Sequence, residues 1–142
     1  MENQCYTYFK IVGDFNPDAI TKMLGIQPEK SWKTGDIRKN GAKYDFSFWS
    51  AGRCDDYDIE IENQMQKTIS ILLDKIELLN QIKNENKVSF YLQIVPTIYV
   101  ENDTPCLAPS LDVIDFCYKT RTKIDIDLYV DTFADKIDIL ED

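Results

Sequence analysis

Histidine is missing altogether from this sequence of 142 residues. Its absence excludes catalytic pairs and triads that need an imidazole base, and it excludes zinc sites with histidine ligands. Hydrolysis by aspartate, lysine or serine alone is chemically possible, but the chain carries no recognised catalytic motif. We therefore expect a protein that is not an enzyme.

Closely spaced cysteines and long apolar runs are missing as well. The cysteines at positions 5, 54, 106 and 117 form no C-x-x-C pair, so we expect no metal and no cofactor. Cys5 and Cys117 are expected to be small buried apolar groups with reduced thiols. Residues 1–4 lack the basic start and apolar run of a secretory signal, and no stretch approaches the roughly 18 apolar residues of a membrane span. We expect a cytoplasmic protein without membrane contact.

Positive charge is scarce, with 16 lysine and arginine residues against 25 aspartate and glutamate residues, a formal net charge of -9. This balance argues against binding to nucleic acid, because phosphate recognition needs clustered positive charge. The imbalance is also uneven: residues 1–53 hold eight basic and six acidic groups, whereas residues 54–142 hold eight basic and nineteen acidic groups. A continuous negative face would steer association with a basic protein, although acidity for solubility alone explains the same counts.

The remaining composition, 44% hydrophobic and 29% charged, suits one globular domain that spans residues 1–142. Strands are predicted from two-residue alternation, and helices from apolar residues spaced three or four apart. In the first half of the chain we predict a strand at 5–12, a short helix that begins at Asn16-Pro17 and ends at Gly25, a basic loop at 27–43, and a strand at 44–50 with one face in the core. One long helix is predicted from about 57 to 84, followed by a strand at 88–94 that either stops at Pro96 or continues through 97–100. A helix capped by Ser110 and a strand at 124–130 complete the order.

The predicted strands have only one clearly apolar face, which helices on a single side would cover. We therefore predict an α+β fold, a two-layer sandwich with a mainly antiparallel sheet and helices on one face. A ferredoxin-like arrangement or a variant of it, with an added strand and helix, fits the predicted order. An exposed edge strand would allow either a monomer or a homodimer.

Three stretches together resemble a known family. They are residues 11–28 (IVGDFNPDAITKMLGIQP) with 33–36 (KTGD), residues 48–50 (FWS) before the predicted long helix, and residues 123–129 (KIDIDLY). In content and order they are similar to a bacterial family known as domain of unknown function 4279. The resemblance implies a small cytoplasmic α+β domain with no established activity and no catalytic residues to transfer. Some members look like immunity proteins of bacterial toxin systems.

An acidic pair near the C-terminus is the first candidate site. Asp125 and Asp127 lie two residues apart on the last predicted strand and share a face, with Tyr129 beyond them. Such a pair would bind Mg²⁺ or divide acid and base roles only with further ligands or an apolar pocket. Two interpretations remain: an acidic face whose binding to a basic protein depends strongly on salt, or an exposed edge whose charges discourage aggregation.

The basic loop and the strand after it supply the second candidate site. Its residues are Trp32, Lys33, Asp36, Trp49 and Arg53. The spacing of a phosphate-binding loop is absent. Residues 28–43 would instead form one wall of a groove for an acidic peptide or a small anion, since tryptophan and arginine concentrate at binding hot spots. The alternatives are that Trp32 folds back onto the sheet, that Trp49 packs beneath the loop, and that Arg53 pairs with a surface carboxylate.

The sequence thus predicts a non-catalytic protein-binding module, of the immunity type that neutralises a basic toxin. The acidic face around Asp125, Asp127 and Tyr129 would contact that partner. The alternative is a sensor domain that binds a small anion or a peptide through the basic, tryptophan-containing loop 28–43.

Overall fold

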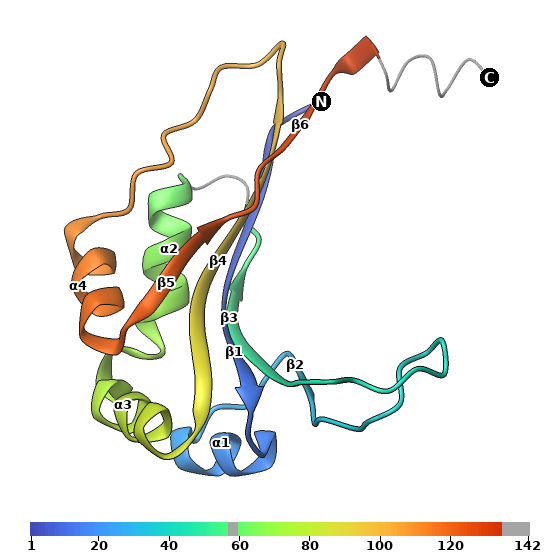
Figure 1. The fold of residues 1–142 in the computed structure, drawn as a ribbon. Helices are drawn as coiled ribbons and strands as arrows, with labels where there is room; N and C mark the ends of the chain where they lie inside the picture. Colours follow the sequence, from blue (N-terminus) through green and yellow to red (C-terminus); the bar gives the residue numbers. More distant parts are fainter. Residues whose placement is uncertain (57–59, 135–142) are drawn as a thin grey trace.

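A sheet with helices on one side only forms the molecule in a computed structural model that describes residues 1–56 and 60–134 (Figure 1). Across the sheet the strands follow the order β2-β3-β1-β4-β5, and β6 also pairs with β4. In chain order the described elements are β1 (Gln4–Asp14), α1 (Pro17–Leu24), β2 (Lys30–Trp32), β3 (Ser47–Cys54), α2 (Ile61–Ser70), the 3₁₀ helix η1 (Leu73–Lys75), α3 (Ile76–Glu85), β4 (Lys87–Tyr99), α4 (Leu111–Thr120), β5 (Thr122–Ile126) and β6 (Tyr129–Asp131).

The sheet is mainly antiparallel. β1 lies between β3 and β4 and runs antiparallel to both, and β2 is antiparallel to β3. β5 and β6 are parallel to β4 and follow a crossover through α4. The predicted two-layer α+β sandwich is therefore confirmed. The order β4-β1-β3-β2 is ferredoxin-like with β5 and β6 added, in a variant whose β1 and β3 are antiparallel.

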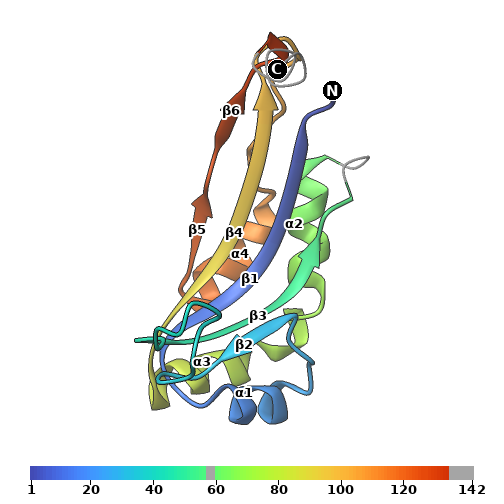
Figure 2. The same ribbon diagram turned by 90° about the vertical axis from the view of Figure 1, so that its right-hand side faces the viewer.

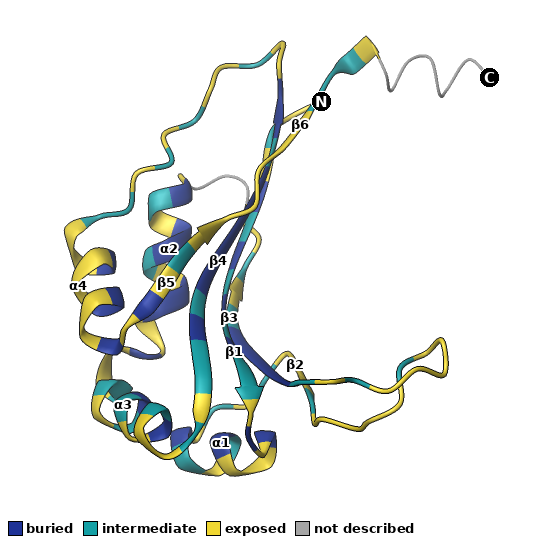
Figure 3. Cartoon of the chain, in the orientation of Figure 1, coloured by how far each residue is buried: buried dark blue, intermediate teal, exposed yellow. Residues whose placement is uncertain are grey.

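The core lies between the sheet and the helices. Alternate residues of β1 and β4 face this layer, and Phe9, Ile11, Phe90 and Leu92 have no exposed surface (Figure 3). The rings of Phe9 and Phe90 meet edge to face with centroids 5.5 Å apart. Burial of each such side chain stabilises the fold by about 1.5–3 kcal/mol, which is why the sheet turns this face toward the helices. The cysteine prediction is also confirmed, since Cys5 and Cys117 are buried free thiols.

Both N-terminal helix caps predicted from the sequence are confirmed, as is the helix end at Gly25. The Asn16 side chain accepts a hydrogen bond from the Asp18 N–H at 3.1 Å, and α1 ends at Gly25 with a left-handed φ of 67°. The Ser110 hydroxyl accepts from the Val113 N–H at 3.3 Å at the start of α4. Each cap satisfies a backbone donor that the helix itself leaves unpaired.

The prediction of one long helix is wrong, because the segment forms α2 and α3 with η1 between them. Its expected start near residue 57 lies outside the described residues. At the junction the Leu72 N–H donates to the Ile69 carbonyl at 2.8 Å, the tighter spacing of a 3₁₀ turn. A straight helix over this length would be about 42 Å long and would run in a single direction. The turn instead directs α3 across the end of the sheet against α1 and α4, where Leu79 and Ile82 are fully buried (Figure 1).

The strand at 44–50 and the loop at 27–43 also need correction. β3 begins at Ser47 and continues to Cys54, and the loop contains the three-residue strand β2, which pairs with β3. An isolated bridge between Ile37 and Lys43 closes the outer part of the loop, which projects away from the helices (Figure 1). β2 has only three residues, too few to show the two-residue alternation on which the prediction relied.

Two further strand boundaries differ from expectation. β4 runs unbroken through Pro96, which lies opposite Cys5, so the continuation to 97–100 is confirmed as far as Tyr99. The strand expected at 124–130 begins earlier, at Thr122, and is divided into β5 and β6. Of its alternate apolar residues only Ile124 packs against the core, while Ile126, Leu128 and Val130 are exposed at the sheet edge.

Candidate functional site

The sheet face opposite the helices is uncovered, and we call it the open face. Figure 2 shows this face toward the viewer, with the described helices behind the strands. Tyr6, Tyr8 and Lys10 of β1 alternate with the core residues of that strand and point to the open face, as do Tyr91 and Gln93 of β4. The rings of Tyr6 and Tyr8 are stacked, with centroids 6.1 Å apart. Aromatic side chains that would ordinarily be buried therefore line an uncovered surface.

A bulge in β3 determines where Arg53 points. Between Ala51 and Cys54, β3 has two residues, Gly52 and Arg53, where β1 has only Tyr8. Gly52 has a φ of 74°, the left-handed conformation that this kind of bulge requires. The extra residue reverses the alternation of side chains along the strand, so Arg53 points to the open face rather than toward the helices.

Arg53 consequently lies on a tyrosine. Its guanidinium carbon is 4.0 Å from the centroid of the Tyr6 ring, a cation–π contact. The Arg53 Nε is 3.8 Å from Asp55 Oδ2, and the two side chains are 42% and 65% exposed, so this pair contributes little to stability. The Arg53 backbone N–H donates to Glu29. The guanidinium edge is left available to a ligand.

Trp32 folds onto the sheet, one of the alternatives that the sequence left open. Its ring stacks on Phe48 with centroids 4.3 Å apart and on Tyr44 at 4.2 Å. The indole N–H donates to the Phe46 carbonyl at 3.1 Å. This aromatic cluster is on the open face and is separate from the core on the helical side.

Beside this cluster is a hollow of about 270 Å³, which we call the tryptophan hollow. It is lined by Tyr6, Tyr8, Glu29, Lys30, Trp32, Phe48, Ser50 and Arg53. The structure thus brings Trp32 and Arg53 together, although 21 positions separate them in sequence. Aromatic walls with two cationic side chains fit an apolar or anionic group.

The other residues of the second candidate site lie elsewhere. Trp49 is fully buried on the helical side, where its indole N–H donates to Thr21 Oγ1 of α1 at 3.1 Å. It packs against α1 and not beneath the loop, contrary to expectation. Lys33 and Asp36 are exposed in the loop, where the Asp36 carboxylate accepts from the Lys33 N–H at 2.8 Å and closes a turn.

A second hollow, of about 400 Å³, lies on the β5 side of the two tyrosines, and we call it the acidic hollow. It is lined by Tyr6, Tyr8, Lys10, Gln93, Val95, Asp125, Ile126 and Asp127. The Tyr129 hydroxyl donates to Asp127 Oδ2 at 3.3 Å, so the structure places all three residues of the first candidate site together. In the described part of the chain, no lysine or arginine lies within 4.0 Å of either carboxylate.

Tyr8 lies between the two hollows, and charged groups of both hollows influence the pKa of its hydroxyl. Burial raises the pKa of its hydroxyl, the neighbouring Tyr6 raises it further, and Arg53 opposes the shift. Asp127 and Asp125 also raise the Tyr8 pKa. At Tyr129 the charge of Asp127, followed by its hydrogen bond, raises the hydroxyl pKa. Both phenols therefore stay neutral hydrogen-bond donors at physiological pH.

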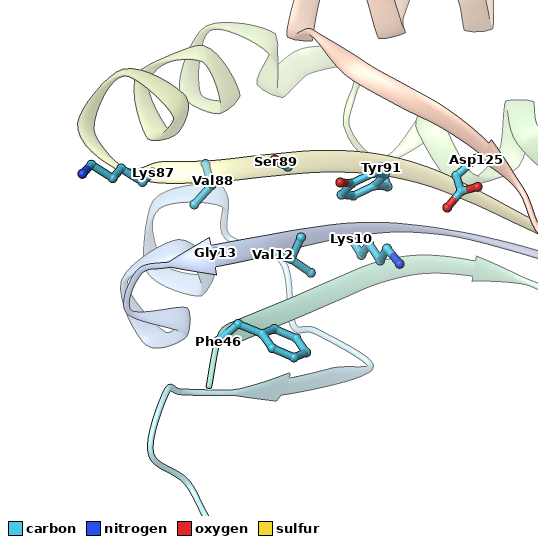
Figure 4. A pocket seen from close by; sticks show the side chains of 9 residues that line it. All are labelled: Lys10, Val12, Gly13, Phe46, Lys87, Val88, Ser89, Tyr91 and Asp125. Atoms are coloured by element: carbon cyan, nitrogen blue, oxygen red, sulfur yellow. The ribbon is translucent and has the colours of Figure 1, made fainter. Parts of the chain in front are cut away.

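A third hollow, which is broad, lies on the same face near Lys87, where β4 begins (Figure 4). It measures about 780 Å³, and Lys10, Tyr91 and Asp125 come from three neighbouring strands to line it. The Lys10 and Lys123 ammonium groups lie 5.1 and 5.8 Å from the centroid of the Tyr91 ring. Charge of both signs is thus distributed around aromatic rings along the whole face.

Sequence reasoning missed Tyr6, Tyr8 and Gln93. The alternation of β1 places the two tyrosines and Lys10 on one face, which was the available signal. That pattern does not tell which face the helices cover, so the aromatic residues of the strand were all compatible with the core. Within the described residues, no group of three or more cysteine, aspartate or glutamate side chains is arranged to hold a metal.

These features define a two-layer α+β domain that presents an aromatic, charged sheet face. The model of the family described as Domain of unknown function (DUF4279) matches residues 3–131, and the chain belongs to that family. No curated protein and no solved structure matches the chain. Among the described helices, none has the length and apolar character needed to cross a membrane.

Proposed function

We propose that this protein is a non-catalytic, cytoplasmic protein-binding module whose partner docks on the open face of the sheet. The observation that carries the proposal is the pair of hollows on either side of Tyr6 and Tyr8, on a face that no described helix covers. Tyrosine, tryptophan and arginine are the residues that contribute most at protein interfaces, and Tyr6, Tyr8, Trp32 and Arg53 gather here.

The charge of the acidic hollow favours a basic partner. Asp125 and Asp127 line one hollow without an ion-pair partner within 4.0 Å among the described residues. The chain carries a net charge of -9, concentrated after residue 53. Opposite charge accelerates association and disfavours wrong partners. An immunity-type module that neutralises a basic toxin would need these properties, and we propose that role.

The tryptophan hollow supports a second candidate function, a sensor for a small anion or a peptide. Arg53 and Lys30 supply positive charge there, and Trp32 supplies a wall. Its volume of about 270 Å³ lies just below the 300–1,000 Å³ typical of small-molecule sites, so one anchoring side chain of a protein fits it better. We therefore rank the sensor below the protein-binding module.

The test is to capture basic proteins from the source cell on the immobilised chain, identify the partner, and titrate it against two variants. Tyr8→Ser alters the open face, and Tyr118→Ser removes a matched tyrosine that is 83% exposed on α4. We expect Tyr8→Ser to weaken binding at least tenfold, about 1.4 kcal/mol, and Tyr118→Ser to leave it unchanged. Circular dichroism checks that both variants fold.

Salt supplies the second arm of that test. An interface between opposite charges weakens as salt rises, because the Debye length falls from about 10 Å at 0.1 M to about 3 Å at 1 M. Affinity that ignores salt, or that Tyr118→Ser reduces while Tyr8→Ser does not, overturns the proposal. Turnover of a small molecule that one aspartate substitution abolishes also overturns it.

A further inference from the structure

The acidic hollow contains a buried hydrogen-bond acceptor that has no partner. Gln93 is only 5% exposed, and its side-chain Oε1 forms no hydrogen bond in the structure. The Nε2 of the same amide donates to the Asp125 carbonyl at 3.4 Å. Because a carbonyl only accepts, this contact fixes the amide with Nε2 toward Asp125 and leaves Oε1 as the unsatisfied end.

Other acceptors and aromatic rings line the acidic hollow together with Gln93. Asp125 and Asp127 line the same hollow, and both lack a cationic partner within 4.0 Å in the described chain. The stacked rings of Tyr6 and Tyr8 form another part of the lining. Two carboxylates, one amide oxygen and two aromatic rings together suit a group that is positively charged, rich in donors and flat.

We propose that the acidic hollow binds the guanidinium group of an arginine side chain that the basic partner supplies. This inference rests on the proposed function and identifies the chemistry that the open face recognises. Guanidinium carries five N–H donors in a plane, so it can serve several acceptors at once and stack on a tyrosine. A lysine ammonium presents a compact charge with three donors and no flat surface, so it fits this set less well.

Lys10 is the group that opposes such a ligand. It lines the acidic hollow, and its ammonium lies over Tyr91 instead of pairing closely with a carboxylate. A guanidinium that enters the hollow meets this like charge. Replacement of Lys10 by methionine keeps a long apolar side chain and removes the repulsion, so it should strengthen binding of arginine.

The probe is N-acetyl-arginine amide, which has neutral ends and one guanidinium, with N-acetyl-lysine amide for comparison. The chain of residues 1–142 is titrated with each probe, and binding is followed by NMR through the backbone amides and the side-chain amide of Gln93. We expect saturable shifts at Gln93, Tyr8 and Asp125, with the arginine probe binding at least threefold more tightly than the lysine probe.

Variants test the named groups. The double variant Asp125→Asn with Asp127→Asn should weaken the arginine probe about tenfold, and Lys10→Met should strengthen it severalfold. Asp112→Asn removes an exposed carboxylate on α4, on the opposite side of the molecule, and should change nothing. Backbone spectra show whether each variant keeps the fold.

The outcomes separate this inference from the proposed function. Shifts scattered over the surface, equal binding of both probes, or indifference to the double variant overturn the guanidinium site. If the partner still requires Tyr8 in that case, the protein-binding proposal stands alone. If the arginine probe behaves as expected while Tyr8→Ser leaves partner binding intact, the docking surface is wrong and the guanidinium site remains.

Discussion

Gly52→Ala should destabilise the protein by about 3 kcal/mol, for two separable reasons. Gly52 has a φ of 74°, where a side chain costs about 1–2 kcal/mol. An added Cβ would also lie 2.8 Å from the backbone oxygen of Thr68 in α2, too close for any real contact. Since the obstacle is backbone, α2 must move away from β3, and overpacking of this kind costs about 1–3 kcal/mol.

Gly25→Ala is the matched control. Gly25 has nearly the same φ, 67°, but nothing lies within 4 Å of the added Cβ. It should therefore cost only about 1 kcal/mol. Urea unfolding followed by circular dichroism measures both variants, and with a slope of about 2 kcal/mol per molar the difference separates their midpoints by roughly 1 M. Equal midpoints would show that α2 yields freely and that the tight approach of α2 to β3 does not constrain the fold.

Three further predictions concern buried polar groups and thiols. Gln64→Leu should lower the free energy of unfolding by about 1–3 kcal/mol, because the Gln64 amide donates to the Cys5 carbonyl at 2.9 Å and to the Asp56 carbonyl at 2.8 Å. Thermal unfolding measures the change, and an unchanged Tm contradicts the prediction. Lys83→Met should lower the free energy of unfolding by about 1 kcal/mol, because the Lys83 ammonium donates to backbone carbonyls at the end of α4. Urea unfolding midpoints measure the change, and a variant more stable than the parent chain refutes the prediction. Burial raises the pKa of the Cys5 and Cys117 thiols to about 11, so iodoacetamide at pH 8 should modify the exposed Cys106 before either of them. Peptide mass spectrometry measures the order of labelling, and early labelling of Cys117 counts against the prediction.

Local chemistry was predictable from the sequence, and longer-range packing was not. The caps at Asn16 and Ser110 depend on residues within four positions, so the sequence alone identifies them. The break after α2 has no such local sign, because its apolar residues keep helical spacing through Leu72. It brings α3 into contact with α1 and α4, which the sequence of the segment itself does not encode.

The candidate sites divide in the same way. Asp125, Asp127 and Tyr129 share one strand region, so their proximity follows from spacing. Trp32 and Arg53 were both candidates, but a pairing of β2 with β3 and a bulge bring them to one hollow. Trp49 is a tryptophan in a strand, as Trp32 is, yet its side chain is buried on the helical side of the sheet. A tryptophan in an alternating strand does not reveal which side a helix will cover.

The bulge at Gly52 also makes the direction of Arg53 depend on how β3 pairs with β1, and not on composition alone. If Gly52 and Arg53 instead paired with β1 in a regular ladder, Arg53 would lie opposite Thr7 and point inward, toward α2, and the tyrosines would lose their cation without any change of charge. A substitution at Gly52 that shifts β3 into such a register should accordingly alter what the open face recognises while the composition stays nearly identical.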